Sequence, residues 1–457
     1  MHPFASYVLR CYNQATGWNE DNLYSNLTKS SRAILDFTVP RGVHFSISKS
    51  ANALFNTSYA MNALPTLNGS IGYIFTSCDL NLKQSSTVPF KEVVDRFVIH
   101  DRPRRPTGKE ELFLGGRNIN AGGKSTRYYV PSSRLDALYT VRLAPTLQGL
   151  IAAVSNPRAR FSPPSPSTLP GESAGNVMFS LQHDTGRWCT EYSWSADDGM
   201  WGVRVLHNFG RLANEAIDIE RVARKERERG TKRVDEEERM EGGLKGRLSA
   251  GAELYFSLKE KSAGVSTGLR FTTLPDASPP SASPDSTTPP IPAQTPTTLT
   301  AILNPMMGHI SAAYAARASR DLALCSRFDF NIYSYESEWT MGAEWWLRRA
   351  AGTRSTGAQQ EEQENDNLNN EPVVMDDLSP PGQDTPSPFP TNGALALAGD
   401  VTGVVKARIS TSSDVSLMWE GRIRNMLVSL GVVSDLSNRS KPIKSIGLEL
   451  AYFSGPE

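Results

Sequence analysis

The last strand-like segment of the chain, residues 444–453, limits its possible folds more than any other feature. The sequence KSIGLELAYF alternates without interruption. Because successive side chains of a strand point to opposite faces, Ile446, Leu448, Leu450 and Tyr452 form one apolar face, and the other face is mixed. Such an ending is typical of a closed membrane barrel, whose last strand pairs with the first. An edge strand of a soluble β-sandwich is the alternative.

Composition excludes several classes of protein. The 457 residues carry a formal net charge of zero, which argues against a nucleic-acid-binding protein that relies on bulk electrostatics. Mean hydropathy is −0.37, and no apolar run approaches the roughly 18 residues of a membrane helix. A β-barrel is not excluded by this test, because the apolar and polar residues of an alternating strand average out in a hydropathy sum. The N-terminal sequence lacks the features of a secretory signal or transit peptide, which disfavours a bacterial-type porin.

Alternation with a period of two begins after Gly42 and recurs to the end of the chain. We count about twenty strands of about eight to twelve residues, or about nineteen if 112–116 and 127–130 form one strand. In water, a barrel of this size would enclose a polar void and expose an apolar exterior, whereas a bilayer requires that arrangement. We therefore predict an all-β transmembrane barrel over residues 41–453.

Two kinds of segment depart from this pattern. Residues 1–40 are predicted to be helical or irregular, because Phe4, Tyr7, Val8 and Cys11 have the spacing of an amphipathic helix. Five insertions are rich in charge, Pro, Ser or Gln, cannot bury a core, and are predicted to be mobile, disordered loops. They are residues 79–110, 155–175, 211–245, 274–296 and 349–398.

The order of the strands predicts the side on which each insertion lies. With nineteen strands and the N-terminus inside the organelle, loops after odd-numbered strands face the cytosol. Four insertions then face the cytosol, and 155–175 does not. Protease treatment of intact organelles that spared 211–245 and 349–398 would contradict this prediction.

Motifs for catalysis, cofactors or metals are weak. Residues 118–125, NINAGGKS, lack the first glycine of a phosphate-binding loop, and an extended segment follows them. The histidines form no HExxH motif, and the four cysteines have no CxxC spacing. Inward-facing carboxylates such as Glu253, Glu344 and Glu420 are expected to line a polar lumen beside Arg247, Arg348 and Arg422. We predict no catalytic, cofactor-binding or metal site, and no enzyme activity.

Two stretches resemble a known family. The first comprises Tyr7–Arg10, Gly17–Phe37 and Pro40–Gly42, with the sequence GWNEDNLYSNLTKSSRAILDF at its centre. The second joins Pro131–Ser133 to LDALYTVRLAPTLQ at Leu135–Gln148. Together they resemble the fungal mitochondrial distribution and morphology protein 10 family. The five insertions do not contribute to the resemblance.

This resemblance implies a nineteen-stranded, VDAC-like barrel in the mitochondrial outer membrane, with the N-terminal segment packed in or near the pore. It also implies a β-signal in the last strand, read by the sorting and assembly machinery, at Ser445, Gly447, Leu450 and Tyr452. If the signal operates, Gly447→Trp or Leu450→Asp should block membrane insertion without affecting synthesis. Normal carbonate-resistant membrane levels of both variants would contradict this.

The implied function is that of a membrane anchor at contact sites between the endoplasmic reticulum (ER) and mitochondria. The family anchors the ER–mitochondria encounter structure (ERMES), which supports tethering and phospholipid exchange. It also assists the sorting and assembly machinery in assembling the general import pore. Expected partners are the lipid-transfer and ER-membrane subunits of ERMES, the sorting and assembly machinery, and membrane lipids, but no nucleic acid. The alternative is a VDAC-like pore for metabolite diffusion.

Overall fold

The wall of the protein is a single closed sheet of 19 strands. The computed structural model describes residues 3–52, 54–78, 80, 82–100, 102–104, 122–130, 133–156, 175–210, 212, 246–273, 295–348, 401–437 and 442–455. The strands are β1 (Gly42–Ser50), β2 (Phe55–Leu64), β3 (Asn68–Thr76), β4 (Gly122–Val130), β5 (Leu135–Ala144), β6 (Leu147–Ser155), β7 (Gly175–Asp184), β8 (Trp188–Ser195), β9 (Met200–Asn208), β10 (Gly246–Ser257), β11 (Ser262–Thr273), β12 (Thr297–Asn304), β13 (His309–Arg317), β14 (Leu322–Asn331), β15 (Ser337–Arg348), β16 (Val401–Ser410), β17 (Asp414–Ile423), β18 (Met426–Asp435) and β19 (Ile443–Ser454).

Pairing of the first and last strands closes the wall. β1 pairs with β19 in parallel, from Gly42 opposite Gly447 to Lys49 opposite Ser454. The pairings from β1 to β15 and from β16 to β19 are antiparallel. The predicted fold class is therefore confirmed, with nineteen strands. Segment 112–116 lies outside the described residues, and β4 is formed by residues 122–130.

The alternation in sequence becomes a difference between the two faces of the wall. Large apolar side chains on the outer face are about half exposed, as at Ile47, Trp345 and Leu417. An outward hydroxyl, Ser326 Oγ, accepts a hydrogen bond from Trp339 Nε1 at 2.7 Å. A bilayer accepts such a face because its apolar side chains meet lipid and its backbone polar groups are paired within the sheet. None of the helices in the described part of the chain has the length and apolarity to span a bilayer.

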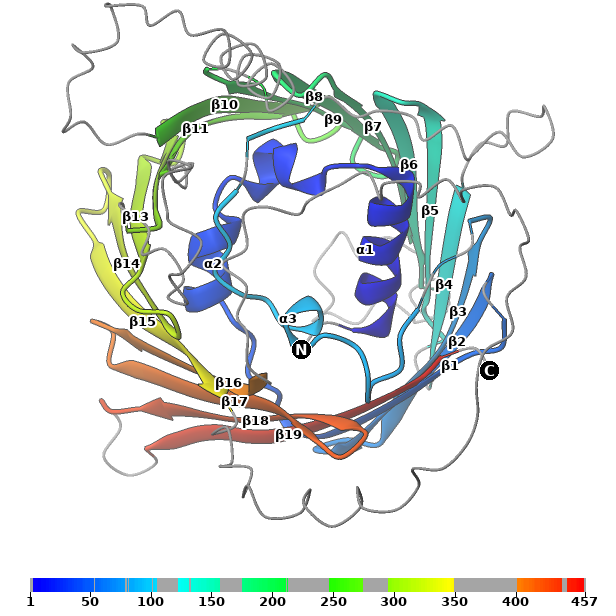
Figure 1. Ribbon diagram of the computed structural model, residues 1–457. Helices are drawn as coiled ribbons and strands as arrows, with labels where there is room; N and C mark the ends of the chain where they lie inside the picture. Colours follow the sequence, from blue (N-terminus) through cyan, green and yellow to red (C-terminus); the bar gives the residue numbers. More distant parts are fainter. Residues whose placement is uncertain are drawn as a thin grey trace, which may run out of the picture. The chain divides into compact units, whose positions relative to one another are not determined.

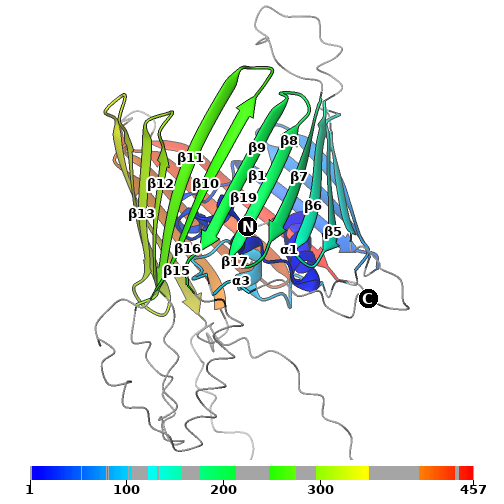
Figure 2. The same ribbon diagram turned by 90° about the horizontal axis from the view of Figure 1, so that it is seen from above.

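Residues 4–40 lie inside the barrel, and we call them the lumenal ring. They form α1 (Phe4–Thr16), the short 3₁₀ helices η1 (Glu20–Asn22) and η2 (Tyr24–Asn26), and α2 (Lys29–Leu35). Helix α1 ends where Gly17 adopts a left-handed conformation with φ of 69°. Figure 1 shows these helices enclosed by the strands, and Figure 2 shows the tilted strands around them.

A second segment, residues 82–100, also packs inside the wall, and we call it the lumenal strap. It contains α3 (Phe90–Val93), and its side chains Val88, Phe90 and Phe97 are almost completely buried. The sequence predicts a loop without a core for residues 79–110, so the described part of this insertion differs from that prediction. The apolar residues of the strap follow neither a helical nor a strand period, and its core is provided by the ring and the wall.

The chain order of the insertions agrees with the strand count. Insertions 79–110, 211–245, 274–296 and 349–398 follow β3, β9, β11 and β15, whereas 155–175 follows β6. Almost all residues of insertions 155–175, 211–245, 274–296 and 349–398 lie outside the described residues. The side of the membrane that each insertion faces stays a prediction.

Candidate functional site

The candidate site is the interior of the barrel, where the ring and the strap contact the inner face of the wall. The ring follows this face from α1, beside β3–β5, to α2, which packs on β13 and β14. Between the helices, the guanidinium of Arg142 lies 4.4 Å from the ring centroid of Trp18. After α2, Arg327 Nη1 donates to Asp36 at 2.8 Å. The ring therefore contacts strands from most of the circumference before it enters β1.

Glycines of the wall make room for the ring. A Cβ atom added to Gly251 of β10 would lie 2.6 Å from Tyr24 Cδ2. A Cβ atom on Gly342 of β15 would lie 2.7 Å from Leu35 Cδ2. Both distances are below those of ordinary van der Waals contacts, so a larger side chain would displace the ring. The wall and the ring are thus matched in shape at separate positions.

The same matching occurs where the ring enters the wall. A Cβ atom on Gly431 would lie 2.6 Å from Val39 Cγ1, and one on Gly447 would lie 2.0 Å from the carbonyl oxygen of Pro40. Gly447 therefore allows the backbone to pass from the lumen into β1.

Buried polar contacts fix the ring in one position. Asn22 Nδ2 donates to Asp184 Oδ1 at 2.7 Å, and Asn208 Nδ2 donates to Asn22 Oδ1 at 2.6 Å. All three side chains are at most 3% exposed. Tyr24 Oη and Ser266 Oγ form a further hydrogen bond of 2.9 Å. Because an unmade buried hydrogen bond is costly, these contacts specify both the position and the rotation of the ring.

Two buried charges of the wall hold the ring and the strap together. Lys406 Nζ donates to the carbonyl oxygen of Ala33 in the ring at 3.0 Å, and to that of Asp95 in the strap. The Glu344 carboxylate accepts from Phe97 N of the strap at 3.1 Å. The sequence predicts that Glu344 lines a polar lumen, but its carboxylate binds the backbone of the strap. Glu253 accepts instead from a wall residue, Arg204, at 2.8 Å.

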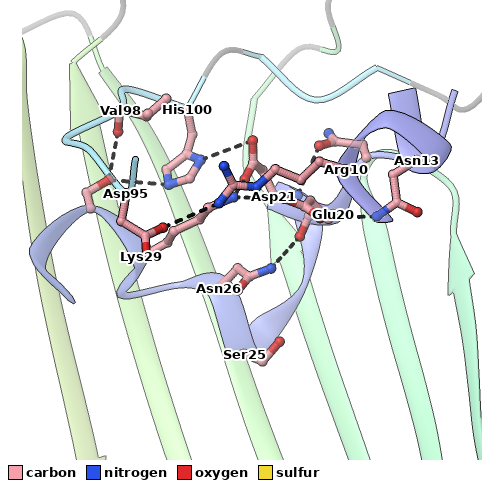
Figure 3. Close-up of polar contacts among 12 residues, drawn as sticks. Arg10, Asn13, Glu20, Asp21, Ser25, Asn26, Lys29, Asp95, Val98 and His100 are labelled. Carbon is pink, nitrogen blue, oxygen red and sulfur yellow. Dashed lines mark hydrogen bonds and ion pairs between the residues drawn. The ribbon is translucent and has the colours of Figure 1, made fainter. Parts of the chain in front are cut away.

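A cluster of ionisable groups joins the ring to the strap (Figure 3). Lys29 Nζ lies 2.6 Å from Asp21 Oδ1 and 3.1 Å from Glu20 Oε1. Ser30 Oγ donates to Val98 O at 2.7 Å and lies 3.3 Å from His100 Nε2. Since the single hydroxyl proton of Ser30 goes to Val98, the contact with His100 requires the imidazole to donate from Nε2.

The surroundings of this cluster set its protonation. Burial, followed by the positive charge of Arg270, lowers the pKa of His100 to about 3, so the imidazole is neutral at pH 7. Burial opposes both members of the adjacent ion pair. For Lys29, the charges of Asp21 and Glu20 outweigh burial and raise the pKa. For Asp21, the basic groups around it outweigh burial and lower the pKa.

A cavity of about 460 Å³ remains between the ring, the strap and the wall. Its lining includes both signs of charge, with Arg10, Lys29 and Lys406 as well as Asp36 and Asp95. Across the described residues, no group of three or more His, Cys, Asp or Glu side chains could hold a metal ion. The four cysteines Cys11, Cys78, Cys189 and Cys325 are free. Gly122–Ser125 lies within strand β4, so this part of the NINAGGKS segment does not open a helix.

The four β-signal residues lie on both faces of β19. Ser445 and Gly447 point inward, while Leu450 and Tyr452 point outward, with Tyr452 38% exposed. The structure therefore places them on one strand but does not bring them together into a pocket. The contact of Gly447 with Pro40 leaves no local signal in the sequence, because the two residues lie far apart in the chain.

Comparisons with known proteins agree in covering the whole chain. The family model described as mitochondrial distribution and morphology protein 10 matches residues 1–454. The protein of that name from Postia placenta is 59% identical, over 99% of this chain and 100% of the relative. The Laccaria bicolor protein has the same identity and coverage. The Cryptococcus neoformans protein is 42% identical, over 99% of each chain.

Proposed function

The chain belongs to the mitochondrial distribution and morphology protein 10 family, and we propose that it anchors contact sites between the ER and mitochondria. In this proposal the barrel resides in the mitochondrial outer membrane and forms the membrane-anchoring subunit of ERMES. It thereby supports tethering and phospholipid exchange. It also assists the sorting and assembly machinery in assembling the general import pore.

The packing of two segments inside the lumen is the observation that favours this proposal over a metabolite pore. The ring and the strap pack inside the wall, and their apolar side chains Ile34, Leu35 and Phe97 are at most 1% exposed. Lys406, Glu344 and Asn22 fix the two segments by buried polar contacts. A diffusion pore needs a continuous aqueous path, whereas an anchor needs a stable wall and accessible rims.

Family membership carries the rest of the proposal. The family is one of structural membrane proteins rather than of known enzymes. The partners in this proposal are the lipid-transfer and ER-membrane subunits of ERMES, the sorting and assembly machinery and membrane lipids. A barrel can bind such partners through its rims and its outer wall.

Affinity purification tests the partners. The tagged full-length protein is isolated from mitochondria in mild detergent, with a tagged metabolite-pore barrel of the same membrane as the control. We expect near-stoichiometric ERMES subunits and components of the sorting and assembly machinery with this protein, but not with the control. Recovery of the barrel alone would overturn the proposal.

Conductance in planar bilayers tests the alternative function. The wild-type protein should show no steady open-pore conductance, because the ring and the strap occupy the lumen. A double variant, Ile34→Ser with Leu35→Ser, weakens the packing of α2. Its channel openings should be several-fold more frequent than those of the wild-type protein. Stable wild-type conductance that is unaffected by the double variant would favour the metabolite pore.

A further inference from the structure

The seam between β1 and β19 differs from the other strand pairings in the way it must form. Its strands are paired in parallel, from Gly42 opposite Gly447 to Lys49 opposite Ser454. Parallel pairs are slightly less stable per residue than antiparallel pairs. The partners also come from opposite ends of the barrel sequence, so no short turn joins them and their loop-closure entropy is the largest in the sheet.

The N-terminal helix covers one end of this seam from the inside. Phe453, near the end of β19, points into the lumen and is 1% exposed. Its ring centroid lies 5.0 Å from that of Phe4. Tyr7 stacks on the same ring at 6.2 Å, with an angle of 9° between the planes. Aromatic packing of this kind adds to the energy of burial, so α1 contributes directly to holding the last strand.

The lumenal strap binds the same end of β19 through its backbone. Ser85 N donates to the carbonyl oxygen of Phe453 at 3.0 Å. Ser85 Oγ donates to the carbonyl oxygen of Asn425 and lies 3.2 Å from that of Phe453. Lys83 N donates to Tyr7 Oη at 3.4 Å. These bonds connect the last strand, the turn between β17 and β18, and α1.

The other end of the seam is covered by the chain as it leaves the ring. Pro40 and Arg41 pass directly over Gly447, where a Cβ atom would lie 2.0 Å from Pro40 O and 2.8 Å from Arg41 N. The seam is thus covered from the inside at both ends, by segments that are not strands of the wall.

We propose that α1 and the lumenal strap form a latch that holds the β1–β19 seam closed, with Phe4, Tyr7 and Ser85 as its contacts on β19. Closure of the barrel is then complete only when these segments have docked in the lumen. Release of the latch weakens the seam and leaves pairings elsewhere in the wall intact. If the two segments merely fill space, their loss would instead loosen the whole wall.

Hydrogen exchange in detergent micelles distinguishes these cases with the full-length protein. The latch variant is Phe4→Ser with Tyr7→Ser. The matched control is Tyr24→Ser with Leu27→Ser, which alters ring residues packed on β9–β11. We expect the latch variant to exchange about tenfold faster in β1 and β19 and to leave β10 and β11 unchanged. The control variant should exchange faster in β10 and β11 and leave β1 and β19 unchanged.

A covalent closure of the seam provides the second measurement. Phe45 and Leu450 are partners in register, so Phe45→Cys and Leu450→Cys can be joined by a short thiosulfonate cross-linker. This cross-link should restore slow exchange in β19 of the latch variant, and a reducing agent should reverse the effect. If the latch variant does not accumulate as a barrel, the single variants Ser85→Ala and Phe4→Leu, which change the latch less, replace it in the exchange measurement. Equal acceleration in all strands, or unchanged exchange in β1 and β19, would overturn the proposal.

Discussion

The outer and inner faces of the barrel wall share the same strands but meet different requirements. The outer face repeats one property, a half-exposed apolar side chain, at positions such as Ile409, Leu417 and Leu430. The inner face contains glycines beneath the ring, buried charges and buried amides. Lipid has no fixed shape and adapts to the outer face, whereas the ring and the strap present one fixed surface to the inner face.

This difference predicts how the two faces respond to substitution. On the outer face, exchange of one apolar residue for another preserves what the bilayer requires. On the inner face, even a single methyl group or a lost hydrogen bond affects a specific contact.

The largest effect is expected for the buried lysine of β16. Lys406→Met removes the donor to Ala33 and Asp95 and leaves the nearby Glu344 as a buried charge, so it should lower the free energy of unfolding by about 3–5 kcal/mol. Ile409→Met, on the outer face of the same strand, should cost less than about 1.5 kcal/mol. Urea unfolding in micelles, followed by tryptophan fluorescence, measures both. Equal costs would contradict the distinction between the faces.

Glycine to alanine substitutions compare the faces through a single methyl group. Gly447→Ala places a Cβ atom against the Pro40 backbone and should cost about 3 kcal/mol. Gly149→Ala, on the outer face, meets only side chains at 3.4 Å or more and should change stability little. Thermal unfolding of the two purified barrels gives the comparison. Unchanged stability of the Gly447 variant would show that the chain can pass from the ring into β1 by another route.

The β-signal hypothesis requires a test that separates signalling from the lipid face. Leu450→Asp and Leu430→Asp both place an acid on the outer wall, at a similar cost of up to about 2 kcal/mol. If the machinery reads Leu450, its variant should also insert less, as measured by carbonate-resistant import into isolated mitochondria. Equal insertion of the two variants would assign the defect to the lipid face alone.

Acid sensitivity of the contact between ring and strap is expected to be the smallest effect. His100 is 3% exposed and faces Ser30, Asp21 and Lys29 of the ring and the wall residues Arg247 and Arg270. Its folded pKa, about 3, is below the ordinary value of 6.5, so the released state binds the proton more tightly. Stability is therefore complete above pH 6.5 and falls by about 2 kcal/mol between pH 6.5 and 5.

His100→Gln should remove this loss, because glutamine does not titrate. His309→Gln, at a half-exposed position on β13, is the matched control and should retain it. Proteolysis of the strap at pH 7 and pH 5 is a suitable measurement. The lowered pKa of Asp21 adds a second loss only at still lower pH, as that carboxylate is protonated. An identical acid response in both variants would refute the role of His100.

The strands could be predicted because each carries its own signal. The alternation at Leu135–Ala144, Ser337–Arg348 and Ile443–Ser454 follows from the two-residue repeat of a strand between lipid and lumen. The amphipathic helix at the N-terminus was predicted for the same reason, although α1 extends further, to Thr16.

The strap could not be predicted because its burial depends on distant partners. Phe90 packs edge-on against Trp346, and Phe97 packs with Ile34 and Leu35 of the ring. None of these contacts leaves a local period in the sequence. The functions of Glu344 and Gly447 were hidden in the same way, since each touches a segment hundreds of residues away.

A local periodicity of apolar residues is enough to select the strands and their outward face, so the amino-acid sequence already specifies a membrane barrel with a helical N-terminal segment. The segments that pack inside that barrel, and the way its seam is covered, follow from the tertiary structure. Those outcomes depend on shape and on hydrogen bonds between segments such as the ring, the strap and β19. Contacts of that kind form only after the wall has brought distant residues together.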